Sequence, residues 1–351
     1  MPVTHTDLFD KVVSRENLIA AALELFTGKR RFKPDVLYVA THLLDVVNWL
    51  HTELVNGTWT PMPYNRFIAK NDVKRRIVHA PAVFDRIVHH AIMRVVHPLF
   101  ITKFVHDSYA ITPGKGNQRA VRRLQAFLAA ATACAHGAPV YAVKADIHKF
   151  YPNMNHRVLR RQLARTLRDK RLLDLWWAYI TAFAMYMPGV GLPVGAYISQ
   201  LSANVYLNPL DHFVKDQLGM YWYVRYMDDF VVLSTDIDEL FAFIAVVNDF
   251  LHTELGLVLN PKTSVFRVVH GMDFVGYRVF ADRVRPRRRN VRRARTRFRG
   301  IAARWCGTSA DHEELRQQVA AFAGNLTPCA ALTTFNATRA DFRRRAGIDS
   351  Q

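Results

Sequence analysis

Two adjacent aspartates interrupt an otherwise apolar and aromatic stretch, residues 223–232, and they constrain how this part of the chain folds. Aspartate is a poor strand former. The pattern therefore predicts two strands, 221–226 and 230–233, joined at a turn that carries Asp228 and Asp229. Two carboxylates at the tip of a hairpin repel each other unless a cation lies between them. The alternative interpretation is an ordinary polar turn without a metal.

A third aspartate supports the metal interpretation. Asp146 ends an apolar strand that begins at Val140, one strand–helix–strand unit upstream of the hairpin. Hard divalent cations such as Mg²⁺ prefer carboxylate oxygens. Two such ions, roughly 3.5–4 Å apart, activate a hydroxyl and stabilise a leaving pyrophosphate. We therefore predict a catalytic site in which Asp146, Asp228 and Asp229 hold two Mg²⁺ ions, with Mn²⁺ as the alternative.

The spacing of apolar residues predicts helices at the N-terminus and alternating strands and helices in the middle of the chain. Ser14 is the expected N-cap of a helix whose buried face includes Leu18, with Gly28 at its end. The other expected helices and strands are, in order, helix 38–54, strands 66–69 and 75–78, helix 85–96, strand 140–143, helix 156–186, a helix from about 199, the hairpin, helix 238–253 and strand 257–260. The order around the three aspartates is typical of a split βαβ unit.

The charge of the chain favours a polyanionic partner. The formal net charge is +19, and the segment from Arg283 to Arg304 holds eleven arginines and no acidic residue. A solvated helix face normally mixes charges of both signs, so this segment indicates contact with nucleic-acid phosphates. The tail after it predicts two or three amphipathic helices.

Several classes of protein are excluded. No apolar run reaches the roughly 20 residues needed to span a bilayer. The first ten residues lack the apolar core of a signal peptide. The three cysteines (Cys134, Cys306 and Cys329) are too few and too far apart for a disulfide framework or a zinc site. We expect a cytoplasmic protein without a membrane partner.

A series of motifs in the chain resembles the reverse transcriptases. Residues 226–229 (Tyr-Met-Asp-Asp) resemble their YxDD box, and residues 146–151 (Asp-Ile-His-Lys-Phe-Tyr) resemble their first palm motif. The likeness continues in order through residues 74–77, 107–116, 256–263 and 271–277.

The resemblance implies an α+β right-hand polymerase with fingers, a split βαβ palm and a helical thumb. The expected domains are N-terminal helices and fingers at 1–135, a palm at 136–281 with a helical insertion at about 156–190, and a basic helical thumb at 282–351. The resemblance also adds Ile147 to the metal-binding residues.

Other roles follow from the same motifs. Arg76, helped by Lys74, is expected to neutralise the triphosphate of the incoming nucleotide with its guanidinium fork. Tyr151 falls where the family keeps an aromatic residue under the sugar, which selects deoxynucleotides. The residues expected to contact template and primer are Tyr226, Met227, Lys262, Gly276, Tyr277, Arg287, Arg288, Arg292 and Arg295.

One nucleotide-binding segment departs from most relatives. Val194 precedes Gly195 where group II intron and retroviral enzymes have Gln, and Gln200 stands where many have Pro. This pattern resembles the enzymes of diversity-generating retroelements, in which base selection opposite template adenine is poor. A Val side chain offers no amide to fix the nucleotide, so a mismatch loses less relative to a match. The alternative is drift at a tolerant position, or a trait shared by several bacterial lineages.

The predicted function is therefore RNA-directed synthesis of DNA, error-prone at template adenines as in a diversity-generating retroelement. The expected partners are an RNA template, a DNA or RNA primer, dNTPs, and a small basic accessory protein or a second polymerase subunit. Three alternatives are an antiviral defence enzyme with its own non-coding RNA, a catalytically inactive RNA-binding scaffold, and an RNA-dependent RNA polymerase, which Tyr151 disfavours.

Overall fold

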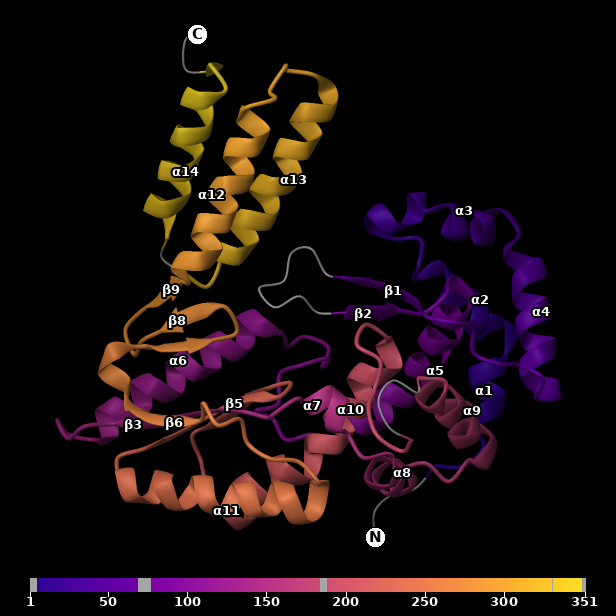
Figure 1. Cartoon of the computed structure of the whole chain (residues 1–351), viewed down its shortest axis with the longest axis horizontal. Coiled ribbons are helices and arrows are strands. Elements are labelled where there is room, and N and C mark those ends of the chain that lie inside the picture. The colour runs from indigo at the N-terminus through magenta and orange to yellow at the C-terminus, as the bar shows by residue number, and fades with distance from the viewer. Residues whose placement is uncertain (1–4, 69–76, 184–187, 330, 349–351) are drawn as a thin grey trace. The chain divides into compact units, whose positions relative to one another are not determined.

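The computed structural model describes residues 5–68, 77–183, 188–329 and 331–348, which form helices and antiparallel sheets (Figure 1). The chain divides into two compact units, one of residues 1–106, 147–218 and 246–261 and one of residues 107–146, 219–245 and 262–351. The expected division into fingers, palm and thumb stays a prediction. None of the helices in the described ranges is both long and apolar enough to cross a membrane.

The first unit is mainly helical. Ser14 caps α2 as expected, because its hydroxyl accepts a hydrogen bond from the backbone N–H of Asn17 at 3.2 Å. The helix ends at Leu23, before the predicted end at Gly28. In residues 1–106 and 147–218 of this unit the helices are α1 (Phe9–Val13), α2 (Arg15–Leu23), the 3₁₀ turn η1 (Gly28–Phe32), α3 (Pro34–Thr41), α4 (Leu43–Asn56), α5 (Val83–Ile101), α7 (Phe150–Asn153), α8 (His156–Ala164), α9 (Lys170–Thr181), α10 (Tyr197–His212) and the π-helical η2 (Phe213–Gln217).

Two predicted helices are each interrupted. The stretch 38–54 is divided between α3 and α4, since the hydroxyl of Thr41 bonds back to the carbonyl of Leu37 at 3.1 Å and the chain turns at His42. The stretch 156–186 is divided between α8 and α9, because residues 166–168 pair with the backbone of His5. Asp169 then caps α9. Side-chain and long-range hydrogen bonds thus end helices that periodicity alone would continue.

A two-stranded hairpin also belongs to the first unit. Strands β1 (Asn65–Ile68) and β2 (Ile77–Ala80) pair antiparallel, with Ile68 opposite Ile77. The two predicted strands are therefore present with bounds shifted by one or two residues. Lys74 and Arg76, expected to bind the triphosphate, lie outside the described residues.

The second unit is built on a four-stranded antiparallel sheet in the order β4-β5-β3-β6. Its strands are β3 (Tyr141–Asp146), β4 (Tyr223–Tyr226), β5 (Asp229–Ser234) and β6 (Ser264–Arg267). Helix α11 (Ile237–Leu255) follows β5, and its residues from 246 onward belong to the first unit. The prediction of a strand at 257–260 is wrong. Leu257 and Leu259 are buried, but Leu259 makes an isolated bridge to Ile147 and its backbone N–H donates to the side chain of Asn248. The edge strand is β6, which pairs with β3.

One apolar core joins this sheet to a helix and to a second, smaller sheet. Helix α6 (Asn117–Cys134) contributes buried residues such as Leu124 and Leu128, and they pack with Val231 and Leu233 of β5. The small sheet consists of β7 (Met272–Phe274), β8 (Tyr277–Val279) and β9 (Val284–Pro286), preceded by the 3₁₀ turn η3 (Val268–His270). Phe274 of β7 lies in the same core.

The C-terminal part forms three helices, within the two or three expected. They are α12 (Arg288–Ala302), α13 (Ser309–Leu326) and α14 (Leu332–Arg345). Their shared core includes Phe298, Phe322 and Phe342, one from each helix. Thr308 begins α13 with a capping box completed by Asp311. The arginine-rich segment is thus largely a packed helix, α12.

Candidate active site

Strand pairing places the three predicted catalytic aspartates at one end of the four-stranded sheet. In the pairing of β3 with β5, Asp146 lies directly opposite Asp229. Residues in that relation have Cβ atoms about 4.5–5.5 Å apart and project from the same face. Tyr226 closes the hairpin by pairing with Asp229, which leaves Met227 and Asp228 as the turn. Strand register therefore brings together carboxylates that are 83 residues apart in the sequence.

The surroundings of Asp229 disfavour its ionised form. Burial, together with the charges of Asp146 and Asp228, raises the pKa of Asp229 to about 6, although Lys144 opposes the rise. The Oδ1 atom of Asp229 is buried and has no hydrogen-bond partner among the described residues. Its other oxygen lies 3.4 Å from the ammonium group of Lys144. Burying an ionised carboxylate costs free energy unless it is paired, so a cation at Oδ1 would lower that cost.

The side-chain donors of these residues are of the kind that a divalent metal ion prefers. The donors are hard carboxylate oxygens, and one of them is buried without a partner. Within the described ranges, no three Asp, Glu, His or Cys side chains already converge closely enough to hold an ion. Mutual repulsion opposes convergence of like charges until a cation joins them. The metal-binding roles of Asp146, Asp228 and Asp229 stay predictions.

A buried arginine fixes the backbone of the aspartate turn. The side chain of Arg225 is fully buried, and its guanidinium donates to the carbonyl of Met227 at 2.8 Å and to the hydroxyl of Ser108 at 3.0 Å. Met227 adopts a left-handed φ of +57°, which is unusual for a residue other than glycine. The guanidinium therefore supports a turn with an uncommon backbone conformation.

The loop at residues 107–116, one of the segments that resemble reverse transcriptase motifs, is hydrogen-bonded to β4. The backbone of Arg225 exchanges hydrogen bonds with Asp107 and Tyr109, at 2.9 and 3.0 Å. Asp107 is buried, and its carboxylate accepts a hydrogen bond from Arg123 of α6 at 2.7 Å. The loop therefore connects β4, through Asp107, to helix α6 and helps to stabilise the strand.

The residues expected to contact the primer form a second tight turn. Val275 and Gly276 connect β7 to β8, and both have positive φ, +44° and +91°. The side-chain amide of Asn290 donates to the carbonyl of Gly276 at 3.0 Å. Tyr277 is buried beside the turn. Because a β-branched residue rarely adopts a left-handed backbone, Val275 marks a second strained position within a predicted motif.

Four predicted nucleotide-binding residues lie in the first unit. The carbonyl of Tyr151 accepts a hydrogen bond from Leu192 at 3.0 Å, and that of Val194 accepts one from His79 of β2 at 2.9 Å. Gly195 has a φ of +115°, and a Cβ atom there would lie 2.8 Å from the side chain of Val78. Close packing against β2 thus requires glycine at this position. Gln200 is part of α10.

Two further predicted residues have simple placements. Ile147 is buried, and its backbone bridges to Leu259 in the first unit. Lys262 is exposed in the turn before β6 in the second unit.

The arginines expected to bind nucleic acid fall into two groups. Arg287 donates to the carboxylate of Asp273 at 2.7 Å, which joins the start of α12 to β7. The others, Arg288, Arg292 and Arg295, are exposed along α12. Arg287 is therefore engaged in a contact within the protein, whereas the exposed three present their charge to solvent.

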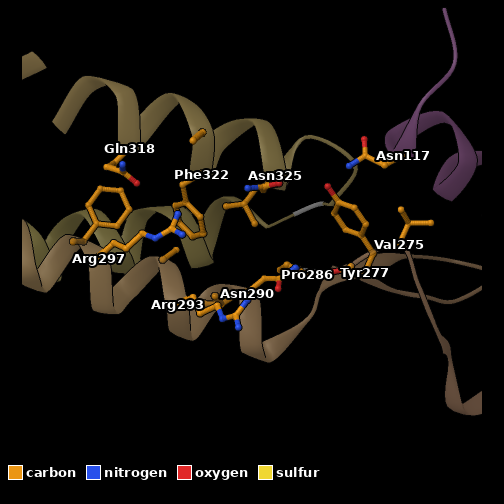
Figure 2. Close-up of a pocket in the computed structure, with 16 residues that line it drawn as sticks. Asn117, Val275, Tyr277, Pro286, Asn290, Arg293, Arg297, Gln318, Phe322 and Asn325 are labelled. Atoms are coloured by element: carbon orange, nitrogen blue, oxygen red, sulfur yellow. Dashed lines mark hydrogen bonds between the residues drawn. The ribbon is translucent and has the colours of Figure 1, made fainter. Parts of the chain in front are cut away.

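A cavity of about 250 Å³ lies between α12, α13 and the turn between β7 and β8. Figure 2 shows Asn290, Arg293 and Arg297 on α12 and Gln318, Phe322 and Asn325 on α13 around this cavity, with Tyr277 and Asn117 at one end. Amide and guanidinium groups thus stand next to the predicted primer-contacting turn.

Two residues of the site were not predicted from the sequence. Lys144 lies two residues before Asp146 and therefore projects from the same face of the sheet. Arg225 projects from the opposite face, where its neighbours Tyr223 and Phe230 are fully buried. A charged residue within an otherwise apolar strand is the signal that could have revealed both.

The fold and the paired carboxylates define a right-hand polymerase. The family described as reverse transcriptase (RNA-dependent DNA polymerase) matches residues 68–279, more than half of the chain. The chain belongs to this family and is an enzyme of the RNA-directed DNA polymerase class.

Protein YkfC of Escherichia coli is 26% identical over 275 residues, which cover 67% of this chain and 71% of YkfC. The group II intron-encoded protein LtrA of Lactococcus lactis is 24% identical over 221 residues. That alignment covers 54% of this chain but only 36% of LtrA.

A solved structure of telomerase from Candida tropicalis, bound to a fragment of telomeric RNA, superposes with a TM-score of 0.50 at 12% identity. The match covers 87% of this chain and 63% of the telomerase chain. At this identity the likeness concerns the fold alone.

Proposed function

We propose that this chain extends a primer along an RNA template with dNTPs, using two divalent ions held by Asp146, Asp228 and Asp229. The observation that carries the proposal is the pairing of Asp146 with Asp229 at a position where one carboxylate oxygen is buried without a partner. Ions bound there would activate the primer 3′-hydroxyl and stabilise the leaving pyrophosphate. Mg²⁺ is the proposed ion, with Mn²⁺ as the alternative.

The chain's own residues supply the remaining parts of the proposed reaction. Arg225 holds the backbone of the turn, and Lys144 partly neutralises Asp229 when no ion is bound. Tyr151 is proposed to exclude ribonucleotides, and the net charge of +19 favours the RNA and primer strands. Lys74 and Arg76 keep their proposed role on the triphosphate.

Primer extension on an RNA template, with and without Mg²⁺, tests this function. We expect product that requires the metal and disappears in Asp228→Asn. The matched control is Asp238→Asn, which removes an exposed carboxylate from the first turn of α11. Absence of DNA product from the wild-type protein with either Mg²⁺ or Mn²⁺ would contradict the proposal.

The finer proposal is that synthesis is error-prone at template adenines, as in diversity-generating retroelements. It rests on Val194, whose carbonyl is bonded to β2 and whose successor Gly195 packs closely against Val78. The backbone at 194 is therefore fixed, and its side chain has no amide with which to hold a nucleotide. An RNA carrying an imperfect adenine-variable repeat and a small basic accessory protein are the partners that this proposal implies.

Sequencing of the products tests the finer proposal separately. We expect errors concentrated opposite adenine, and we expect Val194→Gln to reduce them because an amide is restored. Val194→Ile is the matched control, since it changes size but adds no hydrogen-bonding group. An error spectrum that is uniform over the four bases would refute this proposal and leave the polymerase assignment intact.

A further inference from the structure

The arginines of α12 form two stripes on different faces of the helix. Arg288, Arg292 and Arg295 follow the i, i+4, i+7 spacing of one face, and Arg293 and Arg297 follow the i, i+4 spacing of another. The second stripe lines the cavity beside the predicted primer-contacting turn. The first stripe does not line that cavity, so it requires a different explanation.

A separate groove of about 660 Å³ lies along the first stripe. The N-terminus of α14 forms its opposite side, and α12 packs against α14 in the three-helix bundle (Figure 1). Among the residues that the structure describes, none that lines the groove is acidic. The polar residues that matter for recognition are Arg285, Arg288, Arg292, Arg295, Thr333 and Thr334.

The positive charge of this groove is concentrated near the start of α14. Further along the helix, Arg299 is paired with Asp341 at 3.2 Å, and Arg295 approaches Thr338. Arg288 and Arg292 form no ion pair with an acidic residue in the described part of the chain. Their backbone positions are four residues, or about 6 Å, apart along α12.

The start of α14 adds uncharged donors. Its N-cap residue Ala331 offers no side-chain acceptor to the first N–H groups of the helix. Thr333 and Thr334 place two hydroxyls at the same helix end, within the lining of the groove. Hydroxyls can exchange hydrogen bonds with a ribose 2′-hydroxyl, which RNA has and DNA lacks.

We propose that this groove binds the phosphate backbone of an RNA segment other than the template–primer hybrid. The proposal rests on the proposed polymerase function, which supplies RNA as the partner. The guanidinium groups of the first stripe contact phosphates, and the hydroxyls of α14 contact the ribose. On this proposal Arg288, Arg292 and Arg295 bind this RNA segment instead of the template and primer, and the second stripe remains for the hybrid.

Thr334→Glu tests the groove with little risk to folding. The residue lies in the first turn of α14, where an acidic side chain is favourable to the helix. In the groove, the new carboxylate repels phosphate. Ala310→Glu is the matched control, because it adds the same charge to the exposed first turn of α13 outside the groove lining. Arg285→Gln is a second variant, which removes one groove cation.

The binding measurement uses fluorescence anisotropy of a labelled single-stranded RNA added to protein already saturated with an unlabelled short RNA–DNA hybrid. We expect the saturated wild-type protein to bind the RNA, and Thr334→Glu to weaken that binding by at least about tenfold. Ala310→Glu should change it less than about twofold. Arg285→Gln should lower the slope of log affinity against log salt by about 0.7, as expected for one lost phosphate contact to a single strand.

Extension of the pre-annealed hybrid is measured in parallel and should be the same in all these variants. Three results would overturn the groove proposal: no RNA binding by the hybrid-saturated protein, equal effects of Thr334→Glu and Ala310→Glu, or equally tight binding of DNA with the same sequence. Failure of the polymerase proposal would show differently, as wild-type protein that binds the hybrid without extending it in Mg²⁺ or Mn²⁺.

Discussion

The aspartate hairpin (β4, β5 and the turn between them) and α12 are two charged regions of the second unit, and they use charge in opposite ways. In the hairpin, adjacent carboxylates are partly buried and fixed by strand pairing, so that Asp229 has a raised pKa and an oxygen without a partner. On α12, arginines are mostly exposed and distributed over two faces. The expected function of the hairpin depends on the exact position of each carboxylate, whereas that of α12 depends on how many positive charges the helix carries.

This difference predicts different responses to substitution. In the hairpin, strand register sets the position of each aspartate. No neighbouring residue can replace a lost carboxylate, because the adjacent residues in each strand project from the other face of the sheet and the next residues on the same face lie further along the strand. A helix with many exposed cations loses one contact of several, and each contributes little on its own.

The largest effect is expected for Asp229→Asn. The amide keeps the size of the side chain but removes the charge that would hold a divalent ion, so the rate of primer extension should fall by roughly 10³-fold or more. Circular dichroism should show an intact fold. Substantial activity in this variant would show that the hairpin tolerates loss of charge as α12 does, and the contrast would be lost.

Loss of the support under the turn should have the next largest effect. Arg225→Lys cannot bond both the carbonyl of Met227 and the hydroxyl of Ser108, so a buried acceptor loses its donor. We expect the free energy of unfolding to fall by about 2–3 kcal/mol and kcat to fall with it. Urea denaturation measures the first quantity. Arg267→Lys, on the exposed edge of β6, is the control and should change neither.

The raised pKa of Asp229 predicts how pH and metal change stability. In the folded protein the ionised carboxylate is disfavoured, so without metal this group lowers stability as pH rises from about 4 to above 6, by at most about 3 kcal/mol. Mg²⁺ removes that penalty, and it should therefore raise Tm more at pH 8 than at pH 5. Differential scanning fluorimetry measures both curves. An equal Mg²⁺ effect at the two pH values, or an undiminished one in Asp229→Asn, would contradict this account.

The smallest effect is expected for a single exposed arginine of α12. Arg289→Gln should weaken binding of an RNA–DNA hybrid by less than about fivefold and lower the salt slope by about 0.7–0.9. Arg15→Gln, in the first unit, is the control and should leave the slope unchanged. A loss as severe as that of the aspartate variants would mean that α12 also depends on individual positions.

Local patterns were sufficient where a segment's own chemistry decides its structure. The Ser14 cap, the strands on either side of the aspartate turn and the start of α10 near Ser199 were all predicted from short-range signals, and the structure confirms them. The family assignment from the motifs around Asp146 and Asp228 was also correct.

Predictions failed where a distant segment competes for the backbone. His5 pairs with residues 166–168 and ends α8, and Asn248 takes the N–H of Leu259 that a strand would have used. The small sheet β7-β8-β9 was not predicted, because its strands have only three residues each and show too little alternation to detect. In each case the deciding partner lies outside the local window.

Residue types and their order were enough to indicate the family, the excess of arginine and the three aspartates that are predicted to be catalytic. The folded structure was needed to show that Asp146 stands opposite Asp229, that Arg225 is buried under the turn, and that the arginines of α12 divide between two faces. Register, burial and helix packing depend on contacts between segments that are distant in the sequence. Residue types and local patterns do not specify which segments come into contact.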